Sequence, residues 1–199
     1  MSLNTKCRTD LLNHLAEKYN LKRYLEIGLQ NASQNFDKIK CEYKVSVDPD
    51  PNAHATFEMT SDEFFSYDIL SEHRYDLIFL DGLHTAEQVQ KDFENALKIL
   101  SPNGFIVLHD CNPQKEEHTI VPRPTERGHW NGDVYKFAIS LTGTHAFRTV
   151  DIDNGCGVFG GTVNSQVFTV DDPDMTWNYF TKHRKELLKL ISWDEFTKL

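Results

Sequence analysis

Short apolar runs alternate along the chain with segments in which apolar residues recur every three or four positions. The runs at 24–28, 43–47, 76–80 and 105–108 have the length and composition of buried strands. Strands that alternate with helices pair in parallel through right-handed crossovers. The pattern therefore predicts an α/β fold, a Rossmann-like, doubly wound three-layer sandwich with a mostly parallel sheet.

Helices are predicted around these strands from apolar periodicity and from capping residues. A capping box pairs Ser or Thr with Glu or Gln three residues later at the start of a helix. The predicted helices are one within 1–20 that has Leu11, Leu12, Leu15 and Tyr19 on one face, a brief one around Phe36 and Ile39, one after Thr60 and Glu63, one after Thr85 and Gln88 that ends at 101–104, and one at 134–141.

The C-terminal third departs from the parallel pattern. The segments 146–152 and 157–163 read as two strands joined by Asp153-Asn154-Gly155, a turn typical of an antiparallel hairpin. Residues 175–199 are predicted to form a last helix with Trp177, Phe180, Leu187 and Ile191 on one stripe.

The segment 112–133 shows little periodicity and contains three prolines. A loop of this length inside a compact domain is usually functional or disordered. We interpret it as a lid over an acceptor pocket, in which Trp130 offers an aromatic face beside the basic stretch 123–127.

Size and charge narrow the class of protein. The 199 residues fit a single domain, 1–199, and the formal net charge of −9 disfavours binding to nucleic acid or to an anionic membrane. The first ten residues contain no apolar run of the signal-peptide kind, and the four scattered cysteines fit reduced thiols in a cytoplasmic protein. The sequence does not determine the oligomeric state, and a homo-oligomer is compatible with it.

Four acidic residues lie at the ends of predicted strands: Glu26, Asp48, Asp81 and Asp110. Ligands of open α/β sheets bind beyond the carboxyl ends of the strands. A single acid at such a position is often only a helix cap or a turn former. Four of them at successive strand ends predict an active site there.

The first two of these acids fit a nucleotide-binding unit. Gly28 would let a ligand approach the backbone, and Asp48, 22 positions after Glu26, would bind a ribose diol. The residues after Gly28 lack the further glycines of a phosphate-binding loop. This absence disfavours a nicotinamide oxidoreductase and favours a nucleoside ligand without a pyrophosphate, of which S-adenosylmethionine is the common one.

At these positions the chain resembles the class I S-adenosylmethionine-dependent methyltransferases, in particular a small branch often associated with sugar and glycan modification. The likeness runs from about residue 20 to the C-terminus, and it lies in the order and spacing of its motifs. The first loop has Asn31, Ala32 and Ser33 where the family usually has a second glycine. The matching motifs are at 25–28, 47–50, 60–65, 76–84, 107–111 and 130–134.

The resemblance implies roles for individual residues. Glu26 and Gly28 would face the methionine part of the cofactor, Asp48 would bind the ribose hydroxyls, and Ser61 with Asp62 would lie near the adenine. Asp81 is a further candidate for cofactor binding.

The acceptor half of the site would contain the catalytic groups. An acceptor hydroxyl must lose its proton during transfer, and His84 is the first candidate for the base, with His109 second and Asp81 beside them. Some family members hold a divalent metal at the positions of Asp81 and Asp110, where Mg²⁺ would lower the pKa of the acceptor hydroxyl. The third ligand is expected just after Asp110, where this chain has Cys111 and then Asn112, and a thiol is a poor ligand for Mg²⁺.

Two functions follow from these observations. The first is a cytoplasmic S-adenosylmethionine-dependent transferase that methylates an oxygen of a small hydroxylated acceptor, such as a sugar or glycan. The alternative is a degenerate methyltransferase fold that binds a partner or nucleoside without catalysis, which the glycine-poor first loop suggests.

Overall fold

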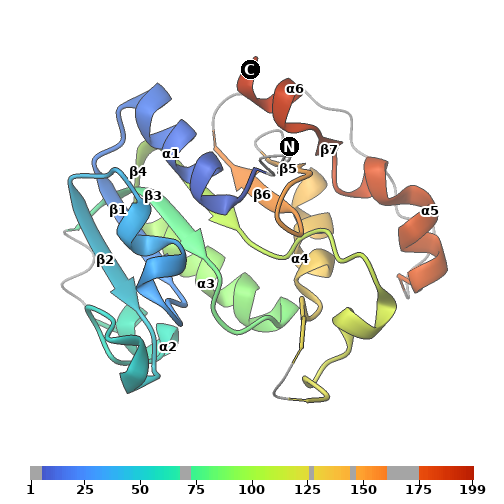
Figure 1. Ribbon diagram of the computed structural model, residues 1–199, viewed down its shortest axis with the longest axis horizontal. Helices are drawn as coiled ribbons and strands as arrows, with labels where there is room; N and C mark the ends of the chain where they lie inside the picture. Colours follow the sequence, from blue (N-terminus) through green and yellow to red (C-terminus); the bar gives the residue numbers. More distant parts are fainter. Residues whose placement is uncertain (1–5, 68–72, 126–127, 144–146, 161–174) are drawn as a thin grey trace, which may run out of the picture.

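The computed structural model describes residues 6–67, 73–125, 128–143, 147–160 and 175–199. The strands are β1 (Arg23–Ile27), β2 (Tyr43–Val47), β3 (Tyr75–Leu80), β4 (Leu100–Leu108), β5 (Phe147–Val150), β6 (Cys156–Phe159) and β7 (Leu190–Ile191). They form one seven-stranded sheet in the order β2-β1-β3-β4-β6-β5-β7 (Figure 1). The strands from β2 to β4 pair in parallel, and β6 is antiparallel to both β4 and β5. This arrangement confirms the predicted Rossmann-like fold.

All four predicted parallel strands are present, and the last three residues of each are buried. β2 has the predicted bounds, β1 is shifted by one residue at both ends, and β3 begins one residue earlier. β4 begins five residues earlier than predicted, at Leu100, because the chain enters the sheet before Gly104. Parallel strands buried on both faces are expected to be apolar throughout.

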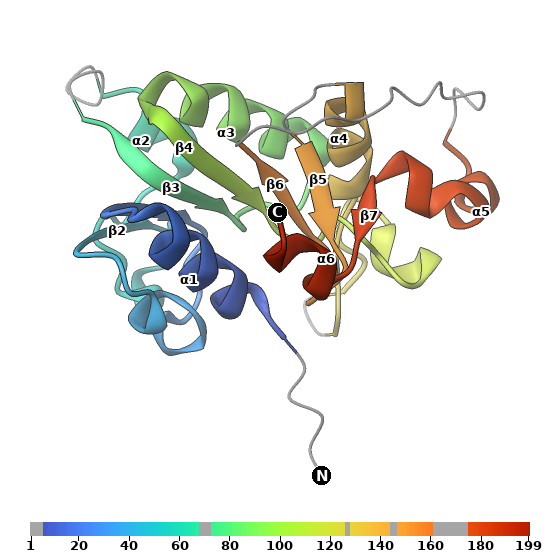
Figure 2. The ribbon, with the colours of Figure 1, turned by 90° about the horizontal axis from the view of Figure 1, so that it is seen from above.

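Helices cover both faces of the sheet. The main ones are α1 (Arg8–Tyr19), α2 (Ser61–Phe65), α3 (Ala86–Ile99), α4 (Val134–Ser140), α5 (Trp177–Leu187) and α6 (Trp193–Thr197). Figure 2 shows α1 and α6 on one side of the sheet and α3 and α4 on the other. Two apolar clusters fill the layers: one packs α3, α4 and α5 against the sheet, and the other packs α1 and α6 against the opposite face.

The helix starts follow their capping residues closely. Thr60 and Glu63 form the predicted reciprocal capping box at the start of α2, with the Thr60 N–H donating to Glu63 at 2.9 Å. At α3 only half of the box forms: the Thr85 hydroxyl accepts from the Gln88 N–H, while the Gln88 side chain turns to other partners. The brief helix predicted around Phe36 is two 3₁₀ turns, η1 (Ala32–Gln34) and η2 (Phe36–Lys38).

The antiparallel hairpin is present as predicted. β5 and β6 pair from Phe147↔Phe159 to Val150↔Cys156, and the turn between them includes Asp153 and Asn154 at positive φ. The predicted ends at Ala146 and at 161–163 lie outside the described residues.

The C-terminal segment differs from the single helix predicted over 175–199. α5 ends at Leu187, the chain then adds β7 parallel to β5, and α6 follows. Ile191, predicted on the helical stripe, lies in β7. A capping box between Ser192 and Glu195 starts α6, so the segment contains a helix-start signal that breaks the longer helix in two.

The segment 112–133 is largely irregular, as predicted, with one 3₁₀ turn, η5 (Glu116–Thr119). Among the described residues, no helix has both the length and the apolar character that crossing a membrane requires.

Candidate active site at the carboxyl ends of the parallel strands

The four strand-end acids lie at the same edge of the sheet, because β2, β1, β3 and β4 run in parallel. Glu26 lies in β1 itself, and Asp48, Asp81 and Asp110 follow β2, β3 and β4 within two residues. The predicted meeting of these residues at one edge is therefore what the structure shows.

Glu26 is buried between the sheet and the η1–η2 segment. Its Oε2 accepts hydrogen bonds from the Tyr24 hydroxyl at 2.6 Å and from the Asn35 amide at 3.1 Å. Burial raises the pKa of Glu26 to about 7. The carboxyl group is therefore close to half protonated at neutral pH.

Gly28 is required by the contact between β1 and β3. It has φ +88°, and a Cβ at this position would overlap the backbone carbonyl of Asp81. Its N–H donates to the Val47 carbonyl at 2.9 Å. The glycine therefore brings the turn after β1 directly against the turn after β3, which joins the predicted cofactor and acceptor halves.

Asp48 holds the turn after β1. Its Oδ2 accepts from the N–H groups of Leu29 and Gln30, both at 2.8 Å, and its Oδ1 accepts from the N–H of Asp50 at 2.8 Å. The carboxylate that the family resemblance assigns to ribose hydroxyls thus organises the first loop.

Ser61 and Asp62 lie together on the first turn of α2 and contact α3. The Gln88 amide donates to the Ser61 hydroxyl at 3.2 Å, to Asp62 at 2.9 Å and to the buried Asp92 at 3.1 Å. Burial raises the pKa of Asp92. Asp92 lies among the buried positions of α3, so the apolar periodicity of the sequence does not single it out.

Asp81, His84 and Asp110 form the most concentrated group of ligating side chains in the described part of the chain. One ligand atom from each lies within 4.8 Å of the other two. His84 Nε2 is 3.4 Å from Asp81 Oδ1, and His84 Nδ1 is 3.0 Å from Asp110 Oδ2. Burial alone would lower the pKa of His84, but the two carboxylates raise it above its ordinary value. The structure therefore brings together three of the predicted acceptor-side residues.

The tautomer of His84 follows from its partners. Nδ1 faces two acceptors, the Asp110 carboxylate and the Trp130 carbonyl at 3.1 Å. A proton on Nδ1 satisfies both, so a neutral His84 leaves its lone pair on Nε2, which lies 3.4 Å from Asp81 Oδ1. Nε2 is the atom available to accept a proton or to bind a cation.

His109, the second candidate base, lies beneath this group. Its side chain is 4% exposed, with Nδ1 3.1 Å from Asp81 and Nε2 3.7 Å from Asp153. Burial would lower its pKa, yet the surrounding carboxylates of Asp81, Asp110 and Asp153 raise it well above its ordinary value. A ring as enclosed as that of His109 is poorly placed to meet an acceptor, and its Nδ1 contacts Asp81 instead.

Arg8 completes the layer under the site from the first turn of α1. Its Nη1 donates to Asp81 Oδ2 at 2.5 Å, and its Nε donates to Asp153 Oδ2 at 3.0 Å. Burial would raise the pKa of Asp81, but His109, then His84 and Arg8, hold it well below its usual range. Asp81 is therefore ionised at neutral pH.

Cys111 does not contribute to the site. Its thiol is buried in the core, 3.6 Å from the carbonyl oxygens of Leu108 and His109, and burial raises its pKa strongly. Cys111 therefore does not provide the third ligand expected just after Asp110, and the Asn112 side chain contacts Asp151 and Arg184. The third ligating side chain beside Asp81 and Asp110 is His84, from the turn after β3.

Three residues of the site were not predicted from the sequence: Arg8, Asn131 and Asp153. Asn131 is fully buried and its amide donates to Asp110 Oδ1 at 2.6 Å. The sequence pattern places Asn131 only within a family motif and Asp153 only within the hairpin turn. Trp130, predicted to stack on an acceptor, stacks on His84 with ring centroids 5.3 Å apart, and the Arg123 guanidinium lies 5.4 Å from its ring centre. Residues 126–127 of the predicted basic stretch lie outside the described residues.

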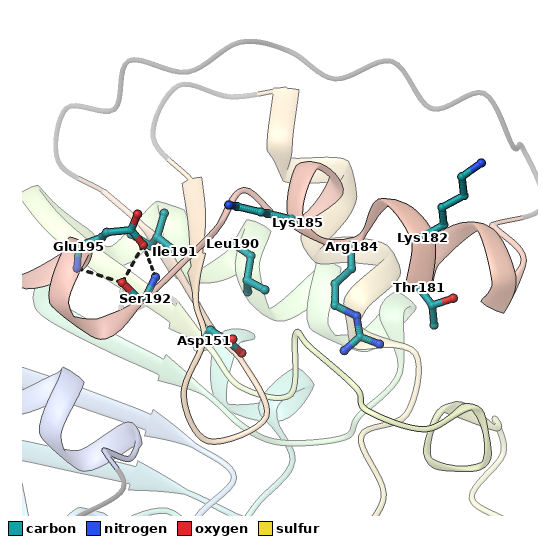
Figure 3. Close-up of a pocket in the computed structure, with 9 residues that line it drawn as sticks. All are labelled: Asp151, Thr181, Lys182, Arg184, Lys185, Leu190, Ile191, Ser192 and Glu195. Carbon is teal, nitrogen blue, oxygen red and sulfur yellow. Dashed lines mark hydrogen bonds between the residues drawn. The ribbon is translucent and has the colours of Figure 1, made fainter.

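A separate cavity of about 400 Å³ lies among α5, β7 and α6, with Asp151 at its base. Figure 3 shows Arg184 extending from α5 toward Asp151. Arg184 also donates to the Asn112 side chain at 3.0 Å, and Asn112 donates to Asp151 at 2.9 Å. The strand-end acids do not line this cavity, so the candidate site is at the sheet edge instead.

The chain is similar to known methyltransferases. Residues 14–111 match the family model of a methyltransferase domain. No curated protein sequence matches the chain. Similar solved structures include a caffeoyl-CoA O-methyltransferase candidate from Staphylococcus aureus, with a TM-score of 0.56 and 19% identity over 77% of this chain and 82% of that one.

Two further solved structures share the fold. One is the SAH-bound methyltransferase PaMTH1 of Podospora anserina, with a TM-score of 0.52 and 18% identity over 77% of each chain. The other is the MycE methyltransferase of the mycinamycin biosynthetic pathway in complex with Mg and SAH, with a TM-score of 0.50 and 14% identity over 85% of this chain and 53% of that one. At these identities the likeness shows the fold.

Proposed function

We propose, from the match of residues 14–111 to a methyltransferase domain, that the chain transfers the methyl group of S-adenosylmethionine to a hydroxyl of a small acceptor, a sugar or glycan. The observation that carries the proposal is the group of Asp81, His84 and Asp110 at the ends of two neighbouring parallel strands. The group lies directly beside the Gly28 turn. In open α/β sheets this edge is where the ligand binds.

The cofactor half is the edge formed by the turns after β1 and β2. We assign Glu26 and Gly28 to the methionine part of S-adenosylmethionine, Asp48 to the ribose, and Ser61 with Asp62 to the adenine. The support is their common position: Asp48 organises the loop after Gly28, and Ser61 and Asp62 begin the helix that follows β2. Asp81 contacts both halves through the Gly28 turn.

The transfer is an in-line displacement at the sulfonium methyl. The bond from the acceptor oxygen to the methyl carbon forms as the bond from sulfur to that carbon breaks, and S-adenosylhomocysteine leaves as a neutral thioether. The acceptor hydroxyl gives up its proton, and His84 Nε2 is the group placed to take it. Asp81 and Asp110 stabilise the imidazolium that results, since each lies within 3.4 Å of the ring.

The same three side chains fit a divalent cation. Two carboxylates and one imidazole nitrogen lie within 4.8 Å of one another. Mn²⁺ binds such a set of donors readily, and Mg²⁺ binds mainly the carboxylate oxygens. Such a cation, when bound, lowers the pKa of an acceptor hydroxyl. Asp81, His84 and Asp110 would hold it, and His109 with Arg8 would orient Asp81 from below.

A second candidate function is a methyltransferase fold that binds without catalysis. The observation that favours it is the occupation of Asp48 and Glu26 by groups of the chain itself: both Asp48 oxygens accept backbone N–H groups, and Glu26 accepts from Tyr24 and Asn35. A cofactor would have to share these carboxylates.

We also propose that the protein is cytoplasmic and that it binds a small molecule, not nucleic acid or a membrane.

Calorimetry with S-adenosylmethionine and S-adenosylhomocysteine tests the cofactor half. We expect saturable binding by the wild-type protein, weakened about tenfold or more, or about 1.4 kcal/mol, by Asp48→Asn. The nearby exposed Asp50→Asn is the matched control and should change the affinity little. Absence of binding at millimolar cofactor would overturn the proposal.

A screen of hydroxylated acceptors for S-adenosylhomocysteine release, with and without EDTA, tests the acceptor half. Release that EDTA leaves unchanged supports His84 as the base, and release that Mn²⁺ or Mg²⁺ restores supports the cation. Cofactor binding without release from any acceptor supports the second candidate function.

A further inference from the structure

Four consecutive residues at the end of the long loop, Trp130, Asn131, Gly132 and Asp133, contact the acceptor side of the site. We propose that this segment is a clasp: a set of positioning residues that fixes the orientation of His84 and Asp110 for the chemistry of the site. The inference rests on the proposed function, because it gives those two side chains their purpose. It adds a role for a segment that lies 46 residues beyond His84 in the chain.

Trp130 fixes the imidazole ring of His84. The two rings stack with an interplanar angle of 11°, and the Trp130 carbonyl lies 3.1 Å from His84 Nδ1. The carbonyl determines which nitrogen carries the proton, and the indole restricts rotation of the ring. The indole N–H donates to the Ile120 carbonyl at 2.8 Å, so the loop in turn holds Trp130.

Asn131 fixes the carboxylate of Asp110. Its amide donates to Asp110 Oδ1 at 2.6 Å and leaves Oδ2 to face His84. Asn131 is fully buried, and its own N–H donates to the His118 carbonyl at 2.9 Å. Asp110 has φ +58°, in the left-handed region that Asp enters more readily than most residues, and the Asn131 amide holds its carboxylate there.

Gly132 and Asp133 fix the backbone of His84. A Cβ at Gly132, which has φ +61°, would overlap the His84 carbonyl oxygen. The Asp133 N–H donates to that same oxygen at 3.2 Å, and the Asp133 carboxylate accepts from the Ala86 N–H at 2.7 Å. The clasp therefore holds both the ring and the backbone of His84, and it also caps the start of α3.

The segment is more than an anchor for the loop. An anchor requires some contact with the domain, whereas here Trp130 contacts the His84 ring, Asn131 holds the Asp110 carboxylate, and Asp133 holds both the His84 carbonyl oxygen and the first turn of α3. The position of the 112–133 loop and the geometry of the site are consequently coupled. A change that shifts the clasp should alter the acceptor side and leave the cofactor side intact.

Two glycines of the same loop provide a matched pair of variants. Gly132→Ala places a methyl group against His84, whereas Gly128→Ala, at φ +103°, meets no atom within 4 Å. Both substitutions strain the backbone at positive φ, so a general effect of strain in the loop should appear in both. Trp130→Ala and Trp130→Phe form a second pair, because Phe retains the stacking face and Ala removes it.

The first readout is the rate at which diethyl pyrocarbonate modifies each histidine, measured by peptide mass spectrometry. We expect His84 to react about threefold faster or more in Gly132→Ala and Trp130→Ala than in the wild type, about 0.65 kcal/mol or more in RT ln of the rate ratio, while Gly128→Ala and Trp130→Phe match the wild type. The exposed His54 serves as the internal standard. An unchanged His84 rate in Trp130→Ala, or an equal increase in Gly128→Ala, would overturn the clasp.

The second readout separates positioning from mere folding support. We expect Gly132→Ala and Asn131→Ala to weaken Mn²⁺ binding about tenfold, or about 1.4 kcal/mol, with S-adenosylhomocysteine affinity within about twofold of wild type. Equal loss of both affinities, or loss of neither, contradicts a positioning role. If the wild type binds no Mn²⁺, the cation part of the proposed function fails, and the histidine rates still decide the clasp.

Discussion

Burial raises the pKa of Glu26, whereas at Asp81 neighbouring cations more than offset the same effect of burial. The Glu26 side chain is 2% exposed, and it is held by neutral donors, the Tyr24 hydroxyl and the Asn35 amide, rather than by a cation in direct contact. Transfer of a carboxylate into such surroundings disfavours the charged form. This is why its pKa rises to about 7, in contrast to that of Asp81, which lies beside Arg8 and two histidines.

The first prediction concerns the pH dependence of stability at Glu26. The folded pKa of about 7 lies above the ordinary value of 4.5, so the folded state binds more protons between these values and stability falls as pH rises from 4.5 to 7. Glu26→Gln removes that loss. We expect the variant to resemble the wild type near pH 4.5 and to be more stable by up to about 3 kcal/mol near pH 8.

Urea unfolding at a series of pH values measures this difference. The exposed Glu58→Gln is the control and should give no comparable gain at high pH. A difference between Glu26→Gln and the wild type that stays constant from pH 4.5 to 8 would show that Glu26 does not titrate in this range.

The second prediction concerns His84 as the base. The base must be neutral, and the pKa of His84 is raised by Asp81 and Asp110 despite burial, so the rate of S-adenosylhomocysteine formation should rise with pH above about 6.5, the unperturbed value. His84→Ala should abolish this rising limb, while the exposed His54→Ala should retain it. A rising limb that survives in His84→Ala assigns the proton to another group.

At the scale of elements, the β1–β3 contact determines how the two halves of the site meet. The turns after these strands lie against each other at Gly28, which allows no side chain. Gly82, in the second turn, is different, because a Cβ there would make ordinary contacts of 3.5 Å or more. Substitution of each glycine by alanine therefore distinguishes the effect of close backbone approach from that of turn flexibility in general.

The third prediction uses this contrast. We expect Gly28→Ala to destabilise the fold by about 3 kcal/mol or more, because it combines a positive φ with overlap against the Asp81 backbone, and Gly82→Ala to cost less than about 1 kcal/mol. Thermal and urea unfolding of both variants provide the measurement. Similar losses in the two would mean that the turns separate easily.

The elements that the sequence predicts well are those built from local pattern. β2 and the start of α2 follow from a short strand-like segment containing Val45 and Val47 and from the capping pair Thr60–Glu63, which act over a few residues. The C-terminal segment was mispredicted for the opposite reason. Ile191 leaves the helical stripe because β5 offers it an edge to pair with, and that edge is not visible in the local sequence.

At the scale of the whole molecule, the site depends on residues that are distant in the chain. Asp81, His84 and Asp110 could be predicted together because strand ends of a parallel sheet converge. Arg8 and Asp153 could not, because their bond joins residues 145 positions apart and depends on where α1 packs on the sheet. Asn131 reaches Asp110 across 21 positions for a similar reason. Long-range polar contacts carry no periodic signature.

Arg8 is the residue that joins these parts, and the last prediction concerns its removal. It links α1 to the end of β3 through Asp81 and to the β5–β6 turn through Asp153, to which its backbone N–H also donates at 2.9 Å. Both ion pairs are largely shielded from solvent, with side chains 14% to 27% exposed. We expect Arg8→Met to lower the free energy of unfolding at pH 7 by about 2 kcal/mol, because it removes one charged donor from each of two carboxylates.

The pH dependence of that loss identifies its cause. Burial would raise the pKa of Asp153, but His109 and Arg8 lower it below its ordinary value of 3.8, so the stability it contributes is present above that pH and disappears as the pH falls through the folded value. The difference between wild type and Arg8→Met should therefore be full at pH 6 and shrink below about pH 4. A double-mutant cycle with Asp153→Asn should show a coupling of about 1 kcal/mol or more at pH 6. Additive losses, or a difference that persists unchanged at pH 3, would mean that Arg8 stabilises the molecule through the packing of its aliphatic stem.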